Sequence, residues 1–418
     1  MKQNKGVLLL YHAVSLKNAS TIFEHINSFP KYSKFKFYLV NTELGFPKIL
    51  KNNTFDCIIL HYSLFGRGYK YELQKDFLDY LLLAHSSVKV VFFQDEYHFC
   101  QKRFEFINQY NIDYVYTLVE PNYFKLTYEK YTNAKNVFWT IPGFVDDTLI
   151  NKAVRFCTDF EKRQIDFFYR GRKLPLYMGK GSQEKYYIAG CFSKLTKNEG
   201  FTLDIETNEK RRLYGDNWYK ALAKSKAVLG VEAGVSLFDI DGSAYKAYQD
   251  YLQIHNNPSE EDIFKLLEPW ENLIFYRTIS PRIFEAAAFR NVQILFEGNY
   301  SNLITPYKHY IPLKKDFSNY DEVISLFKNR RFCKEMTDTA YDDLIKSGKY
   351  SYKTFITEFD NRLLSCGLNN EKAQGTENYS IKTSQILRYP IGIIKSAFYV
   401  QFPGRKKIVA ALRKHKII

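Results

Sequence analysis

The 418-residue sequence lacks several features that would place a protein in a class at once. Its six cysteines form no CxxC pair, so neither a disulfide framework nor a cysteine zinc site is expected. No apolar run approaches the ~20 residues of a membrane helix, and the short apolar run near the start is too brief for a signal peptide. Neither GxxxxGK[ST] nor GxGxxG occurs. These absences favour a reduced, cytoplasmic protein without a standard P-loop.

The sequence does have an excess of positive charge. Its 60 Lys and Arg face 45 Asp and Glu, which gives a formal net charge of +15. Such an excess indicates an anionic partner, and nucleic acid, an acidic membrane surface or a phosphorylated substrate would each fit. The apolar fraction of 45% and the charged fraction of 25% exclude wholesale disorder. At ~150 residues per domain, the length allows two or three domains.

Two series of short apolar runs, separated by helical patterns, predict two domains with parallel sheets. Continuous apolar runs of this length are typical of strands buried on both faces. The first series lies at 6–12, 35–41, 56–62, 88–94, 113–119 and 137–143, and the second at 165–171, 226–232, 291–296 and 309–313. We therefore predict doubly wound α/β domains over 1–155 and 160–350, followed by a closing helix over 351–368.

The remaining segment, 369–418, is predicted to be a linker and a basic amphipathic tail. From Ser380 onward it has no acidic residue, and its Lys and Arg alternate with apolar side chains. Positive charge beside apolar anchors suits the surface of an anionic bilayer. The alternative is a solvated tail that packs against an acidic face of the protein. We expect the tail to hold a cytoplasmic protein at the inner face of the membrane.

A glycine-containing loop follows the first strand of the second series. Residues 169–185 read YRGRKLPLYMGKGSQEK, in which Arg170, Arg172 and Lys185 bracket three glycines before a predicted helix. Backbone N–H groups at a helix N-terminus can hold a phosphate together with neighbouring cations. The alternative is a surface loop whose basic side chains are solvated.

A second candidate segment is ISPRIFEAAAF at 279–289, which places Glu285 on an otherwise apolar helix. A buried carboxylate needs a partner, because an unpaired buried charge is costly. That partner could be the diol of a ligand. The alternative is an ion pair with Arg282, which lies with Ser280 just before the helix.

Three segments, taken in order, resemble the donor domain of GT-B glycosyltransferases, especially bacterial family-1-like and CgeB-like proteins. They are FFYRGR at 167–172, the segment 214–242 around KAVLGVE, and SPRIFEAAAFRN at 280–291. The resemblance covers roughly residues 160–360. It implies the GT-B fold, in which two Rossmann-like domains face a cleft, with the donor bound by the C-terminal domain and the acceptor by the N-terminal one.

The resemblance also implies roles for individual residues. Glu285 would hold the ribose hydroxyls of a nucleotide-sugar, Arg172 and Lys185 would hold its diphosphate, and Glu232 would lie in the loop that faces the sugar. The expected donor-binding set is Arg170, Arg172, Lys185, Glu232, Ser280, Arg282 and Glu285. No cofactor is expected beyond the nucleotide-sugar, which is a substrate.

The chain departs from the family-4-like pattern at the EX7E pair, because Arg277 stands eight residues before Glu285. It also has FRN at 289–291 where ACG is usual. These departures leave the stereochemical outcome open. Asp239 and Asp241 match the DxD metal motif of the other glycosyltransferase fold, but such short acidic motifs are frequent by chance. We expect a metal-independent, hexosyltransferase-like transfer.

The N-terminal domain supplies candidate catalytic residues at its strand ends. Asp95, in FFQDEYH at 92–98, is our first candidate for the base that an inverting transfer needs, while His12 and His61 each follow a predicted strand directly. A retaining transfer needs no such base, and the three residues would then only position the acceptor.

These observations predict an enzyme that moves a sugar from a nucleotide-sugar to a glycan or lipid-linked acceptor in bacterial surface-polysaccharide synthesis. The alternative is a non-catalytic protein of the same fold that binds polysaccharide or nucleic acid. No RNA-recognition, zinc-finger or helix-turn-helix motif supports nucleic acid, so we do not expect that partner.

Overall fold

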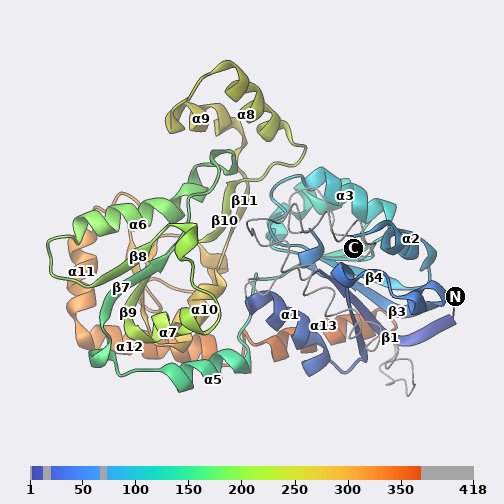
Figure 1. Ribbon diagram of the computed structural model, residues 1–418, viewed down its shortest axis with the longest axis horizontal. Coiled ribbons are helices and arrows are strands. Elements are labelled where there is room, and N and C mark those ends of the chain that lie inside the picture. Colours follow the sequence, from blue (N-terminus) through green and yellow to red (C-terminus); the bar gives the residue numbers. More distant parts are fainter. Residues whose placement is uncertain (1, 13–19, 66–72, 369–418) are drawn as a thin grey trace, which may run out of the picture.

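The computed structural model describes residues 2–12, 20–65 and 73–368, which form two α/β domains and an arm that projects from the second (Figure 1). The predicted linker and basic tail, 369–418, lie outside the described residues. Within the described residues, no helix is both long and apolar enough to cross a membrane.

The N-terminal domain is built on a six-stranded parallel sheet in the order β2-β1-β3-β4-β5-β6. Its strands are β1 (Lys2–Tyr11), β2 (Phe37–Asn41), β3 (Asn53–Leu60), β4 (Val88–Phe92), β5 (Tyr114–Thr117) and β6 (Asn136–Trp139). Leu8 of β1 lies between Tyr38 of β2 and Ile58 of β3. All six predicted runs are therefore confirmed as strands.

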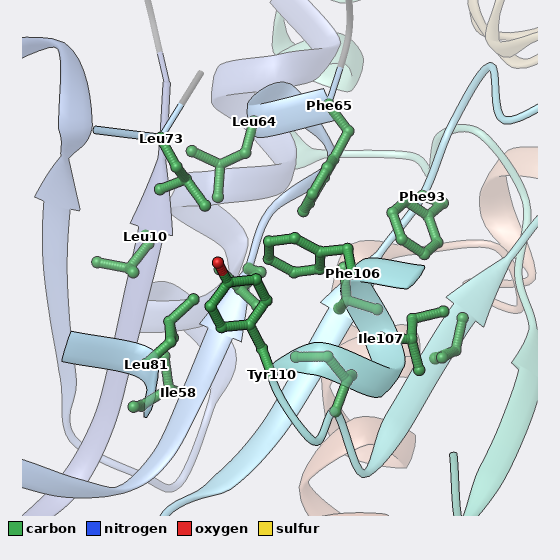
Figure 2. Packing of buried hydrophobic residues seen from close by; sticks show 14 of the residues in the cluster. Leu10, Ile58, Leu64, Phe65, Leu73, Leu81, Phe93, Phe106, Ile107 and Tyr110 are labelled. Atoms are coloured by element: carbon green, nitrogen blue, oxygen red, sulfur yellow. The ribbon is translucent and has the colours of Figure 1, made fainter. Parts of the chain in front are cut away.

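Helices cover both faces of this sheet, which explains why its strands are continuously apolar. On one face, α2 (Lys75–Leu83) and α3 (Cys100–Gln109) contribute Leu81 and Phe106 to a core that includes Leu10 and Ile58 (Figure 2). The short helix α4 (Tyr128–Tyr131) adds Tyr128 on this side. On the other face lie α1 (Ser20–Tyr32) and α13 (Tyr352–Ser365).

Helix α13, predicted as the closing helix, packs on the N-terminal domain although it follows the C-terminal one (Figure 1). Phe359 lies 5.3 Å from Phe29 of α1 and 6.0 Å from Phe92 of β4, measured between ring centres. The chain therefore returns to its first domain after completing its second.

The C-terminal domain has a five-stranded parallel sheet in the order β13-β12-β9-β7-β8. Its strands are β7 (Ile165–Arg170), β8 (Leu203–Glu206), β9 (Ser225–Gly230), β12 (Val292–Phe296) and β13 (Ile311–Leu313). All of them except β8 were predicted from the sequence; β8 is a half-buried edge strand with the polar pattern LDIE. The predicted GT-B class, two doubly wound parallel sheets, is confirmed by this topology.

Helices also cover both faces of the second sheet. One face carries α6 (Glu184–Leu195), α11 (Tyr320–Lys328) and α12 (Arg330–Tyr341). The other carries α5 (Asp147–Phe156), α7 (Asp216–Lys224) and α10 (Pro281–Ala288). Helix α5 precedes the domain boundary that we predicted at residue 155, yet its Leu149 and Ala153 belong to the core of this second domain.

An excursion between β9 and α10 was not predicted. The antiparallel strands β10 (Ala233–Leu237) and β11 (Glu271–Thr278) carry α8 (Ser243–Ile254) and α9 (Glu260–Leu267), which project at the top of Figure 1. We call residues 233–278 the arm. Two backbone hydrogen bonds join it to the N-terminal domain, from Asp239 N–H to the Tyr97 oxygen and from Gln101 N–H to the Ile240 oxygen.

Candidate functional site

A cavity lies at the carboxyl ends of β7 and β9. The sheet order is β13-β12-β9-β7-β8. After β7 the chain adds β8 on one side, and after β9 it adds β12 and β13 on the other side, so β7 and β9 form a topological switch point. Ligands of open α/β sheets bind in the crevice that such a switch point creates. Here a cavity of about 250 Å³ is lined by Arg170 at the end of β7 and by Gly230 at the end of β9. We call it the switch-point cavity.

Positive charge dominates the lining of the switch-point cavity. Its cations are Arg170, Arg172, Lys185, Arg212 and Arg282, and no carboxylate is among the described residues that line it. The N-terminus of α10 also opens onto it, with Ser280 as the N-cap, whose hydroxyl accepts from the Arg282 backbone N–H at 3.4 Å. A helix N-terminus adds a partial positive charge. The cavity is therefore suited to an anion.

The pKa of Lys185 reflects its burial and the positive charges that cluster in this cavity. Its Nζ donates to the Gly234 carbonyl oxygen at 3.2 Å. Burial lowers the pKa of Lys185 to about 8, with Arg277, Arg282 and Arg172 acting in the same direction and Asp95 opposing them. A bound anion would offset this repulsion and favour the ammonium form.

Gly171 allows the loop after β7 to approach this lysine. A Cβ at Gly171 would lie 2.7 Å from the Lys185 carbonyl oxygen and 2.6 Å from the Tyr169 ring. Tyr169 in turn donates its hydroxyl hydrogen to the same carbonyl oxygen at 2.8 Å. A side chain at Gly171 would therefore separate the loop from the start of α6.

The predicted arginines differ in how far their charge is already neutralised. Arg170 donates to Oδ1 of Asp204 on β8 at 2.7 Å, and its side chain is mostly buried. Arg172 pairs with Glu209 at 3.0 Å, but both side chains are half exposed, and such pairs are weak. Arg172 is therefore freer than Arg170 to bind a ligand. Arg212, which the sequence analysis did not single out, lines the same cavity.

Arg282 adopts a different arrangement. Its guanidinium lies 4.9 Å from the ring centre of Trp218 and donates to the Arg170 carbonyl oxygen. Burial lowers the pKa of Arg282, while the neighbouring Tyr169 and Glu285 raise it. The ion pair with Glu285 that we considered as an alternative does not form, because the carboxylate binds Trp218 instead.

Glu285 lines a second cavity of about 200 Å³ that adjoins the first, and we call it the Glu285 cavity. Its Oε2 accepts a hydrogen bond from Trp218 Nε1 at 2.8 Å, whereas Oε1 forms none with the described residues. Burial raises the pKa of Glu285, and Arg282, Trp218 and Lys152 lower it. Thr21 of α1 contributes to the lining from the N-terminal domain. The carboxylate thus presents one open oxygen between the domains.

Glu232, predicted to face the sugar, lies in neither cavity lining. Its Oε1 accepts from the backbone N–H groups of Asn299 and Tyr300 at 3.0 and 2.9 Å, and its Oε2 pairs with Arg277 Nε at 3.1 Å. The physical reason is Arg277, which also donates to Glu184 at 2.9 Å and so joins two carboxylates in a buried cluster. Arg277, at the position of the missing EX7E carboxylate, balances this cluster together with Lys315, which pairs with Glu184 at 2.8 Å.

Asp95 belongs to the N-terminal domain and lines neither cavity. It has a left-handed backbone with a φ of 55°, and its side chain is open to solvent although protein surrounds it closely. Burial raises the pKa of Asp95, whereas the cations Lys185, Arg103 and Arg172 lower it. Because Lys185 and Arg172 belong to the other domain, Asp95 faces the predicted donor cations across the domain boundary.

His12 and His61 meet at the switch point of the N-terminal sheet, between β1 and β3. Ser63 Oγ accepts from the His12 backbone N–H at 3.0 Å and lies 2.8 Å from His61 Nδ1. His61 is fully buried, and its Nε2 lies 3.0 Å from His25 Nδ1, so both of its ring nitrogens have partners. Burial and His25 lower the pKa of His61. Neither histidine lines either cavity.

The DxD motif has a structural role in the arm. The Asp239 carboxylate accepts from the backbone N–H groups of Gly242 and Tyr245 at 3.0 and 2.9 Å, at the start of α8. The described residues contain no group of three His, Cys, Asp or Glu side chains that could hold a metal ion. Metal independence of the reaction stays a prediction.

No protein-family model and no curated protein matches the chain. Among solved structures, it is similar to a glycosyltransferase from Rickettsia africae, with 10% identity over 86% of this chain and 99% of that one and a TM-score of 0.48. It is also similar to Anabaena HepE in complex with UDP, with 9% identity over 87% of this chain and 100% of that one and a TM-score of 0.47. A third similar structure is an alpha-glucosyltransferase in complex with UDP and a 13-mer DNA, with 10% identity over 86% of this chain and 100% of that one and a TM-score of 0.46.

Proposed function

We propose that this protein is a glycosyltransferase that moves a sugar from a nucleotide-sugar to an acceptor hydroxyl. The observation that carries the proposal is the cation-lined cavity at the β7/β9 switch point, adjoined by the cavity into which Glu285 presents a free oxygen. A nucleoside diphosphate sugar carries the two groups that these cavities complement. Its diphosphate is anionic, and its ribose offers a diol to a carboxylate.

The proposed donor complex assigns a task to each group. The diphosphate lies against Lys185, Arg172 and the N-terminus of α10, and a ribose hydroxyl donates to Glu285 Oε1. The hydrogen bond from Trp218 Nε1 holds the Glu285 carboxylate in place. As the bond between sugar and diphosphate breaks, negative charge builds up on the leaving group, and the preorganised cations stabilise it. The cations perform this task without a metal ion.

Asp95 is the candidate for the base that takes the proton of the acceptor hydroxyl. The charges of Lys185 and Arg172, in the opposite domain, act on Asp95, and we place the acceptor beside it, next to the sugar held by those cations. In an inverting transfer the Asp95 carboxylate accepts the acceptor proton. In a retaining transfer it orients the acceptor only.

The acceptor that we propose is a glycan or a lipid-linked glycan of bacterial surface-polysaccharide synthesis. The basic segment from Ser380 onward supports a location at an anionic membrane. Sedimentation of the full chain with anionic vesicles at low salt tests this location, with a chain ending at residue 368 as the control. Equal recovery of both chains in the supernatant would contradict it.

A thermal-shift screen against UDP, GDP, CDP, ADP and dTDP tests the donor site. A ligand at ~100 times its Kd adds about 2.7 kcal/mol to the free energy of unfolding. One nucleotide should stabilise the wild type and Glu335→Ala, a surface control on α12, to the same extent, and Glu285→Ala clearly less. If no nucleotide stabilises the folded wild type, the proposal fails. Salt-sensitive DNA binding in its place would favour the non-catalytic alternative.

A further inference from the structure

A cluster of aromatic side chains lies where the arm meets the N-terminal domain. Tyr177 comes from the short helix η6 (Leu176–Met178), Tyr245 and Tyr248 come from α8, and His98 and Phe99 come from the loop that also carries Asp95. The ring centres of Tyr177 and Tyr245 are 4.9 Å apart, and that of His98 lies 5.1 Å from Tyr177 and 4.9 Å from Tyr245. We call these five residues the aromatic shelf.

Three tyrosine hydroxyls gather on the aromatic shelf. Tyr177, Tyr245 and Tyr248 are each half-buried, and their hydroxyls form no hydrogen bond within the described part of the chain. Burial raises the pKa of Tyr177, and the proximity of Tyr245 and Tyr248 raises it further, so the three phenols lie near one another. Half-buried phenols usually have a hydrogen-bond partner. These three present donors and acceptors that no described residue uses, on rings that remain partly accessible.

Tyr97 connects the aromatic shelf to the proposed donor site. Burial raises the pKa of Tyr97, and the charges that act on it include those of Asp95, Tyr177 and Arg172. Tyr97 follows Asp95 by two residues and directly precedes His98, so one loop carries both the candidate base and two residues of the shelf. Its carbonyl oxygen accepts the Asp239 N–H of the arm at 2.9 Å, which fixes the loop against the arm. The aromatic shelf thus leads outward from the place where the acceptor hydroxyl must react.

From this arrangement, and resting on the proposed function, we infer that the aromatic shelf binds sugar units of a glycan acceptor. A pyranose ring has an apolar face of C–H groups that packs against an aromatic ring, and a rim of hydroxyls that exchange hydrogen bonds with phenols. The shelf offers both kinds of surface. A nucleic acid would require exposed cations, whereas Arg103, which donates to the carbonyl oxygens of His98 and Phe99, is buried. A lipid chain would leave the three hydroxyls without partners.

A glycan array tests the inference with the full-length, fluorescently labelled protein. The array carries bacterial and synthetic glycans, with peptides and phospholipid vesicles as other spots. Wild type and Tyr186→Ala, a half-exposed tyrosine outside the shelf, should bind the same glycans. Tyr245→Ala and Tyr248→Ala should each bind them about tenfold more weakly, which is about 1.4 kcal/mol at 25 °C. Tyr248→Phe keeps the ring and should lose less.

Three results would overturn the inference. They are a wild type that binds no glycan, shelf variants that bind glycans as tightly as Tyr186→Ala, and a wild type that binds only peptides or vesicles. Nucleotide stabilisation of the same samples reports on the donor site separately. If the nucleotide still stabilises every variant while glycan binding fails these criteria, only the shelf inference is wrong. If no nucleotide binds, the proposed function itself is wrong.

Discussion

The ammonium group of Lys185 gives the donor-site proposal a pH signature. Burial lowers the pKa of Lys185 to about 8, helped by Arg277, Arg282 and Arg172 and opposed by Asp95. Only the protonated amine provides a charge-assisted hydrogen bond to phosphate. A bound diphosphate raises this pKa again, because an opposite charge nearby favours the charged form. Above about pH 8, therefore, binding of the donor takes up a proton that the free protein has lost.

Uptake of one proton fixes both the direction and the size of the effect. Nucleotide affinity is highest below the lowered pKa and falls as the pH rises through it. The loss of nucleotide affinity approaches a factor of ten per pH unit, about 1.36 kcal/mol, until the pH reaches the pKa of Lys185 in the complex. The terminal phosphate of the nucleotide titrates near pH 6, below this window. We expect the Kd to rise about tenfold between about pH 8.5 and about pH 9.5.

Isothermal titration calorimetry with the nucleotide selected by the thermal screen measures this slope. Lys185→Met removes an ionic hydrogen bond of about 1.5–3 kcal/mol, so at pH 7.5 it should bind roughly 10–150-fold more weakly and show no slope. Lys180→Met changes an exposed lysine of the same loop and should keep both the affinity and the slope. A wild-type Kd that stays constant through the window, or a slope that persists in Lys185→Met, would refute this reasoning.

Glu285→Ala should weaken nucleotide binding by about 10–100-fold through loss of the ribose contact but leave pyrophosphate binding unchanged, as calorimetry with both ligands can measure. Asp95→Asn should lower the transfer rate about 10²–10⁴-fold with little change in nucleotide Kd, measured by single-turnover kinetics. Burial lowers the pKa of His25 to about 3, and burial together with His25 lowers that of His61. Because both folded values lie below the unfolded value of about 6.5, their stabilisation is present above that pH and lost as the pH falls. Urea unfolding should therefore show a lower free energy at about pH 5 than at about pH 7, and a smaller difference in His25→Phe.

Each of these predictions has a result that would contradict it, and the unfolding experiment also has a control variant. Equal loss of nucleotide and pyrophosphate affinity in Glu285→Ala would mean that the ribose contact does not exist. An undiminished transfer rate in Asp95→Asn would exclude that carboxylate as the base. Replacement of the exposed His85 by Gln should leave the pH dependence of unfolding intact. A free energy of unfolding that is the same at both pH values would contradict the buried neutral histidines.

The two sheets could be predicted because burial on both faces leaves a direct record in the sequence. Ile58, Ile59 and Leu60 of β3 are all fully buried, so neighbours that point to opposite faces are equally apolar. The place of α13 could not be predicted in the same way. The apolar stripe of α13 predicts that the helix packs on a sheet. It does not indicate which of the two sheets, because that depends on the path of the chain after the second domain.

The arm escaped prediction because its two strands have mixed patterns. β10 is five residues long and includes Gly234 and Ser236, and β11 combines the apolar run at 273–276 with exposed positions at Asn272 and Leu273. One signal for α9 was present in the sequence. Ser259 and Asp262 form a reciprocal capping box, the S-x-x-D pattern that marks a helix start before apolar positions.

At the site, the sequence indicated which cations gather but not which charges are already paired. Glycines and basic residues after a strand are local features, so the loop before α6 could be identified. The neutralisation of Glu232 by Arg277 depends on tertiary contacts, as does the bond from Arg277 to Glu184, 93 residues away. Trp218 lies within the segment that carries the family resemblance, yet only the fold shows that it binds Glu285.

The two passages of the chain between the domains lie side by side. Val145 N–H donates to the Tyr350 oxygen at 2.8 Å, and Tyr352 N–H donates to the Val145 oxygen at 3.0 Å. Since β6 precedes this point and α13 follows it, the second domain is topologically an insertion within the first. Both of its ends meet at one place, which is the arrangement that tolerates domain exchange and circular permutation. Two cuts at this crossing would release the second domain as one continuous segment, and Phe238, Ile274 and Tyr276 of its arm would leave the core of the first domain with it.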